Sequence, residues 1–162
     1  APGDGPSHID VFVGEFRMCH PLPLLDRLQE HEETLPATEL LLSKLQIVTL
    51  NVKDRGDLYA LLFGCEVGAG GERGPAVIEA PRIAALAAAD WGLHHTIELN
   101  LARLREALDA VGLDGSSRER IATQIGALAA ALEAAPKSRG WRLRARVGER
   151  RRWYEDPEEV AR

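Results

Sequence analysis

The stretch LPATELLLSKLQIVTLNVKDRGDLYALL, from Leu35 to Leu62, decides the fold of this chain. Its apolar residues recur at helical spacing, in two groups: Leu40, Leu41, Leu45, Val48 and Leu50, then Leu58, Leu61 and Leu62. This pattern predicts two consecutive helices. Pro36 and Thr38 suit the start of the first helix, where a hydroxyl cap is favoured, and Asn51 can end the first helix or cap the second.

Three charged residues interrupt these two apolar patterns. Lys44 falls in the middle of the first expected helix, and Asp54 and Asp57 are three residues apart in the second, so the two aspartates share one face. Such residues are often solvated surface charges, and an acidic residue in a first turn is also favoured by the helix dipole. The alternative is that the three form a polar site between the helices.

The runs LLLSKLQ and KDRGDLYALL resemble the paired motifs of the nucleotidyltransferase superfamily, in particular its abortive-infection type toxins and their relatives. IDVFV, from Ile9 to Val13, resembles the strand that carries the third catalytic carboxylate of that superfamily. DWGLHHTIELNLARL, from Asp90 to Leu104, is similar to the helical region that follows in this branch. The order and spacing of these short motifs carry the resemblance.

The resemblance implies a role for each matching position. Asp10 would be the strand carboxylate that completes a Mg²⁺ site, and Lys44 would reach the phosphates of a nucleoside triphosphate. Asp57, with Asp54 beside it, would be the acidic residue of the following helix. Magnesium takes oxygen ligands and a lysine ammonium is a compact charge for phosphate oxygens, so the residue types suit these roles. Asp10 could equally be an edge or loop aspartate.

The chain departs from the family in one respect. A glycine-serine turn and a D-x-D pair are expected before the third carboxylate, but the residues before Asp10 are APGDGPSHI. We therefore expect the carboxyl-terminal portion of a longer nucleotidyltransferase, which in complete form transfers a nucleoside monophosphate to an RNA, such as tRNA, or to a protein. Because phosphoryl transfer needs several carboxylates, the portion alone should be inactive. The missing fragment or an antitoxin are implied partners.

Composition predicts an α+β chain that is mainly helical. The 162 residues are 45% hydrophobic but only 5% aromatic, which favours helix-on-helix packing. We expect a short amino-terminal β segment within a partial nucleotidyltransferase core at 1–63, a glycine-rich loop at 64–75, and a helical region with a basic tail at 76–162. No stretch is long and apolar enough for a membrane span or a signal sequence, so a cytoplasmic protein without membrane partners is expected.

The second half is expected to be helical to about residue 135. Pro81 can begin one helix, and Ser116 or Ser117 can begin the last one. His94 and His95 are adjacent, so they point in different directions and cannot form an i, i+4 metal pair. We expect both histidines to be surface or capping residues, and the alternative is a contact with a nucleotide.

Charge is concentrated in the segment KSRGWRLRARVGERRR, residues 137–152, with eight basic residues against one acidic and a net charge of +7. Arg142, Arg144 and Arg146 alternate with small or apolar residues, which predicts a half-exposed strand. The segment could hold an RNA backbone, with Trp141 or Trp153 stacking on a base. The expected nucleic-acid ligands are Arg142, Arg144, Arg150, Arg151 and Arg152.

Two structural interpretations of this segment stay open. It could be an edge strand protected by its charge from unwanted pairing, or it could pair with the acidic body of the same protein. If catalysis is absent altogether, the chain is a noncatalytic interaction module that binds nucleic acid or protein through residues 137–152.

Overall fold

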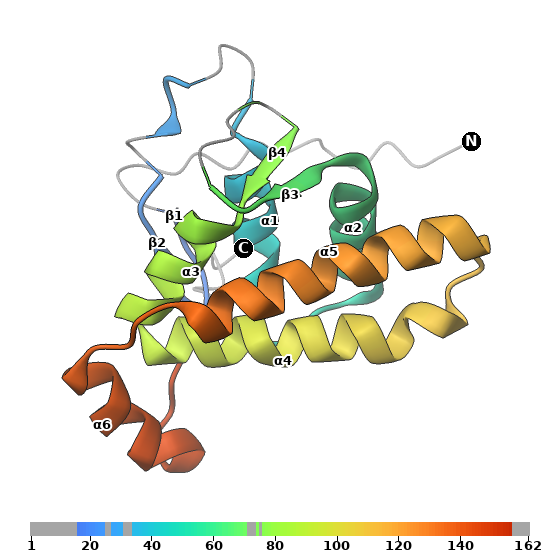
Figure 1. The fold of residues 1–162 in the computed structure, drawn as a ribbon. Coiled ribbons are helices and arrows are strands. Elements are labelled where there is room, and N and C mark those ends of the chain that lie inside the picture. Colours follow the sequence, from blue (N-terminus) through green and yellow to red (C-terminus); the bar gives the residue numbers. More distant parts are fainter. Residues whose placement is uncertain (1–15, 25–26, 31–33, 71–73, 75, 157–162) are drawn as a thin grey trace, which may run out of the picture.

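The fold is α+β and mainly helical, as the composition predicts (Figure 1). The computed structural model describes residues 16–24, 27–30, 34–70, 74 and 76–156. Asp10 and the expected strand Ile9–Val13 lie outside the described residues. None of the helices in the described part is both long and apolar enough to cross a membrane.

The described chain begins with a small antiparallel pair. Strands β1 (Phe16–Arg17) and β2 (Pro21–Leu22) pair so that Phe16 lies opposite Leu22. Leu22 is fully buried and anchors this pair to the hydrophobic core.

Two short helices follow, as their apolar spacing predicts. Helix α1 (Ala37–Leu45) and helix α2 (Val52–Gly64) pack against each other and bury five leucines: Leu41, Leu42, Leu45, Leu58 and Leu62. Helix α1 ends at Leu45 rather than continuing toward Leu50. The reason lies in another helix, because the buried side chain of Asn100 donates hydrogen bonds to the carbonyl oxygens of Leu45 (2.9 Å) and Ile47 (2.7 Å).

Of the helix caps predicted at Thr38 and Asn51, only the one at Asn51 is confirmed. Asn51 caps α2, accepting a hydrogen bond from the backbone N–H of Asp54 at 2.8 Å, which confirms one of its two expected roles. Thr38 does not cap α1, so that expectation is wrong. Its buried hydroxyl accepts from the N–H of Glu79 (2.9 Å) and donates to the carbonyl of Val77 (3.3 Å), tying α1 to a strand.

That strand is β4 (Val77–Glu79), which pairs in parallel with β3 (Glu66–Gly68). Part of the segment expected to be a loop at 64–75 is therefore a strand. Main-chain pairing with β4 explains the difference, since glycine-rich sequence gives no local signal for it. The hydrophobic core includes residues from both sides of this segment, for example Leu58 and Ile97.

The second half is a helical layer, as predicted. Helices α3 (Ala80–Ala89), α4 (Trp91–Ala107) and α5 (Gly115–Ala134) pack together, and a 3-10 turn, η2 (Leu108–Ala110), extends α4 (Figure 1). Asp114, not Ser116 or Ser117, caps α5. Its carboxylate accepts from the N–H of Ser117 and from both serine hydroxyls, and a charged acceptor is the stronger cap.

The expected carboxyl-terminal strand is instead helix α6 (Arg139–Val147), followed by the 3-10 turn η3 (Gly148–Arg150), so that prediction is wrong. Ser138 caps α6 through the N–H of Trp141 at 3.0 Å, and the chain turns at Gly148 with φ of +58°. Alternation suggested a strand, but at helical spacing the same residues turn Trp141, Arg144 and Ala145 toward the body. Helix α6 stands apart from the helical layer at one end (Figure 1).

Candidate functional site

The structure brings together Lys44, Asp54 and Asp57, which the sequence places on two different helices. The Lys44 ammonium lies 2.8 Å from Asp54 Oδ1 and 3.0 Å from Asp57 Oδ2. The aspartates do share one face of α2, as their spacing predicts, and that face meets Lys44 of α1. We call these three residues the Lys44 cluster.

The two carboxylates of the Lys44 cluster have different surroundings. Asp54 is buried beside the Asn51 cap, whereas the side chain of Asp57 is 44% exposed. Hydrogen bonding to Asp54, and then to Asp57, raises the pKa of Lys44 above its ordinary value despite partial burial. Lys44 is therefore a protonated cation whose charge is shared between one structural carboxylate and one that faces solvent.

This arrangement limits the chemistry available to the Lys44 cluster. A phosphate oxygen can reach the lysine only in competition with two carboxylates, and the exposed Asp57 is the easier one to displace. Within the described residues, no three His, Cys, Asp or Glu side chains gather as a metal site. Asp10, the residue expected to bind Mg²⁺, lies outside the described residues, so its distance to Lys44 stays a prediction.

The basic segment separates into outward and inward arginines. Arg139, Arg142 and Arg146 lie on the exposed face of α6, and Arg150 and Arg151 are exposed beyond it. We call Arg139, Arg142 and Arg146 the α6 arginine face. The side chain of Arg142 donates to the carbonyl of Lys137, and those of Arg139 and Arg146 make no hydrogen bond or ion pair with the described residues.

Besides Arg142, two of the expected nucleic-acid ligands are already engaged, Arg144 and Arg152. The Arg144 guanidinium lies 4.5 Å from the centre of the Trp91 ring and donates to the carbonyls of Gly148 and Arg151, both at 2.8 Å. Arg152 forms an ion pair with Asp156. Arg144 therefore holds the segment to the body, and Arg152 is partly neutralised.

The tryptophans of the segment are not free to stack on bases. Trp141 donates from Nε1 to the carbonyl of Ala87 at 3.1 Å, and Trp153 donates from Nε1 to the hydroxyl of Thr96, also at 3.1 Å. Both rings are half-buried against the body. Any nucleic acid that binds here would contact arginines and not these indole rings.

The chain after α6 is fastened to the amino-terminal strands. The N–H of Glu155 donates to the carbonyl of Cys19 at 2.9 Å, and the Glu155 carboxylate pairs with Arg17. His20, which follows Cys19, is buried, and its Nε2 lies 2.9 Å from the Thr96 hydroxyl. Burial lowers the pKa of His20. The contacts of Glu155 therefore hold the chain directly after the basic segment against the amino-terminal strands.

Gly92→Ala is expected to loosen this attachment, because a Cβ at residue 92 would lie 2.3 Å from the main-chain oxygen of Trp153. The main chain has to move, so Trp153 should become more exposed, with faster amide exchange from residue 151 to 155 and little change in α5. Hydrogen exchange by mass spectrometry measures both regions. Gly126→Ala, where a Cβ meets nothing within 4 Å, is the control. Equal exchange at residues 151–155 in the two variants would refute the expectation.

A second charged cluster, which the sequence did not reveal, lies in the core. Glu39 is fully buried on α1 and its Oε1 contacts Arg82 Nε at 2.5 Å and Arg27 Nε at 3.4 Å. Arg27 also pairs with Glu30 and Glu79. We call these five residues the Glu39 cluster. Its members are scattered from residue 27 to residue 82, so local spacing could indicate the contact of Arg27 with Glu30 but not the contacts with Glu39, Glu79 and Arg82.

We compared the chain with known proteins, and no protein-family model, curated protein or solved structure matches it.

Proposed function

We propose that this chain belongs to a nucleotidyltransferase-like protein and binds the phosphates of a nucleoside triphosphate at the Lys44 cluster. One observation carries the proposal. The lysine and the aspartates assigned to one site by the motif resemblance come from two helices and meet within 3.0 Å. Within this function, Asp57 is the exposed carboxylate that yields to phosphate, and Asp54 holds the lysine in place.

The reaction proposed for the complete protein is transfer of a nucleoside monophosphate from the triphosphate to an RNA or protein acceptor. Magnesium would be held by carboxylates outside the described residues, with Asp10 among them. The ion neutralises phosphate charge and orients the triphosphate in such reactions. The part played by the described residues is to place one cation, Lys44, against the phosphate oxygens.

Lys44→Ala is expected to weaken binding of ATP, CTP, GTP or UTP in the presence of magnesium by about tenfold, because a charge-assisted hydrogen bond contributes roughly 1.5–3 kcal/mol and this one is shared with two carboxylates. Isothermal titration calorimetry measures the loss. Lys53→Ala removes a neighbouring exposed lysine and is the control. Circular dichroism of both variants checks folding, since Asp54 loses a partner in the first.

Two results would overturn the nucleotide proposal. One is triphosphate binding that is equally strong in the wild type, the Lys44→Ala variant and the Lys53→Ala control. The other is the absence of magnesium-dependent binding by the folded wild-type chain.

A second function, nucleic-acid binding through α6 without catalysis, is favoured by a separate observation. The α6 arginine face is exposed, and two of its three guanidinium groups make no ion pair or hydrogen bond with the described residues. Arginine binds phosphate oxygens through a planar fork of donors. Titration of labelled single-stranded RNA, with and without the α6 arginine face, tests this function.

A further inference from the structure

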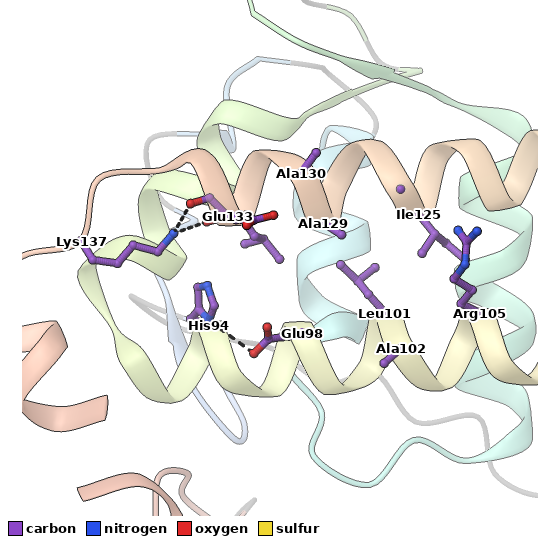
Figure 2. A pocket seen from close by; sticks show the side chains of 12 residues that line it. His94, Glu98, Leu101, Ala102, Arg105, Ile125, Ala129, Ala130, Glu133 and Lys137 are labelled. Carbon is purple, nitrogen blue, oxygen red and sulfur yellow. Dashed lines mark hydrogen bonds and ion pairs between the residues drawn. The ribbon is translucent and has the colours of Figure 1, made fainter. Parts of the chain in front are cut away.

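The groove between α4 and α5 is a separate feature of the molecule, remote in sequence from the Lys44 cluster. It encloses about 720 Å³, within the range of sites that hold small molecules. Leu101 and Ile125 form its buried floor, and Ala129 and Ala130 are small enough to leave room beside them (Figure 2). Gly126 also lines the groove. An apolar molecule would therefore lose its contact with water on the side that lies on Leu101 and Ile125.

One end of the groove contains a buried polar atom that no described residue pairs with. His94 is 9% exposed, so the expectation of a surface or capping residue is wrong for it, and its Nε2 makes no hydrogen bond with the described residues. The ring extends from α4 toward α5 (Figure 2). It also contacts Trp141 edge to face, with 5.1 Å between ring centres. An unpaired buried nitrogen costs stability, and a ligand that supplies the missing partner recovers it.

The protonation of His94 decides what that partner must be. Burial lowers the pKa of His94, which outweighs the opposing effect of Glu98, so the ring is neutral at pH 7. The Glu98 carboxylate is 4.0 Å from Nδ1 and favours the proton on that nitrogen. Nε2 is then an acceptor, and the complementary ligand group is an O–H or N–H donor.

The charged residues around the groove do not favour an ionic ligand. Two are acidic, Glu98 and Glu133, and two are basic, Arg105 and Lys137. Lys137 donates to the carbonyl of Glu133 at 2.8 Å, and Arg105 donates to that of Ala122 at 3.3 Å. Opposite charges are therefore balanced, and both cations already have main-chain acceptors.

We propose that this groove is a binding site for a small neutral organic molecule with an apolar body and one O–H or N–H group that donates to His94 Nε2. The apolar body lies on Leu101 and Ile125. The Lys137 side chain, at the same end of the groove (Figure 2), shifts to admit the donor. This site is independent of the nucleotide proposal.

Indole and 1-methylindole are matched probes, because they differ mainly in the N–H donor. We expect indole to bind the folded protein with a Kd of roughly 1 mM, as its size allows, and about threefold to tenfold more tightly than 1-methylindole. Ligand titration followed by ¹H–¹⁵N NMR measures both affinities. At saturation, indole should shift the imidazole ¹⁵N resonances of His94 more than 1-methylindole, because only indole donates a hydrogen bond to Nε2.

His94→Phe is the decisive variant, since phenylalanine keeps an aromatic contact to Trp141 and removes the acceptor. We expect this variant to be at least as heat-stable as the wild type and to bind the two indoles equally. Equal binding of both probes by the wild type, or no saturable binding of indole up to about 10 mM, overturns the proposal. The His94 ¹⁵N readout on the wild type stands even if the variant does not fold.

Discussion

Glu39→Ala is expected to lower the free energy of unfolding by about 3–5 kcal/mol, the usual cost of breaking a buried ion pair from one side. Glu39 is fully buried, accepts a hydrogen bond from Arg82 and forms an ion pair with Arg27 at 3.4 Å. Without it, Arg27 stays buried with only Glu30 and Glu79 to balance its charge. Urea unfolding followed by circular dichroism measures the loss.

Two further variants separate charge from volume in this measurement. Glu39→Gln keeps the shape and one acceptor oxygen, so its free energy of unfolding should lie between those of the wild type and the alanine variant. Glu119→Ala removes an exposed glutamate from α5 and should change stability by less than about 0.5 kcal/mol. A loss below 1 kcal/mol for Glu39→Ala would show that the Glu39 cluster contributes little to the fold.

Removing the α6 arginine face is expected to weaken binding of single-stranded RNA about 50-fold near 0.15 M salt. Each phosphate contact contributes a slope of roughly 0.7 to the dependence of log K on log salt, so three contacts contribute about 2. The triple variant Arg139→Ala, Arg142→Ala, Arg146→Ala should therefore also reduce the slope of log K against log salt by about 2. Alanine supports helices, so α6 should persist.

Fluorescence anisotropy across a salt series measures both quantities. Trp141 and Arg144 hold α6 to the body and stay unchanged in the triple variant, which makes the loss specific to the exposed face. The double variant Lys53→Ala, Arg55→Ala removes basic charge from α2 and is the control. RNA affinity that does not depend on salt concentration, or that falls equally in both variants, would refute binding through α6.

The local features of this fold were predictable because each depends on residues close in sequence. Apolar spacing predicted α1 and α2, and the preference of asparagine for helix starts predicted the Asn51 cap. The shared face of Asp54 and Asp57 follows from 3.6 residues per turn. Their meeting with Lys44 agrees with the motif resemblance, although spacing alone also allowed three solvated charges.

The error at residues 142–147 has a definite physical cause. Arginine alternating with small and apolar residues fits a strand, but the same residues also fit a helix that exposes one face. Contacts distant in sequence decided between the two: Trp141 with Ala87, and Arg144 with Trp91. Likewise α1 ends at Leu45 because the Asn100 side chain donates a hydrogen bond to the carbonyl oxygen of Leu45.

The sequence by itself therefore determined a mainly helical α+β fold, helices α1 and α2 with the Asn51 cap, and the charged residues of the Lys44 cluster. Only the tertiary structure decided which charged side chains are buried and which remain exposed. It placed Glu39 and His94 in the interior and left the α6 arginine face in solvent. Burial depends on which distant segments pack together, whereas helical periodicity is set by neighbouring residues.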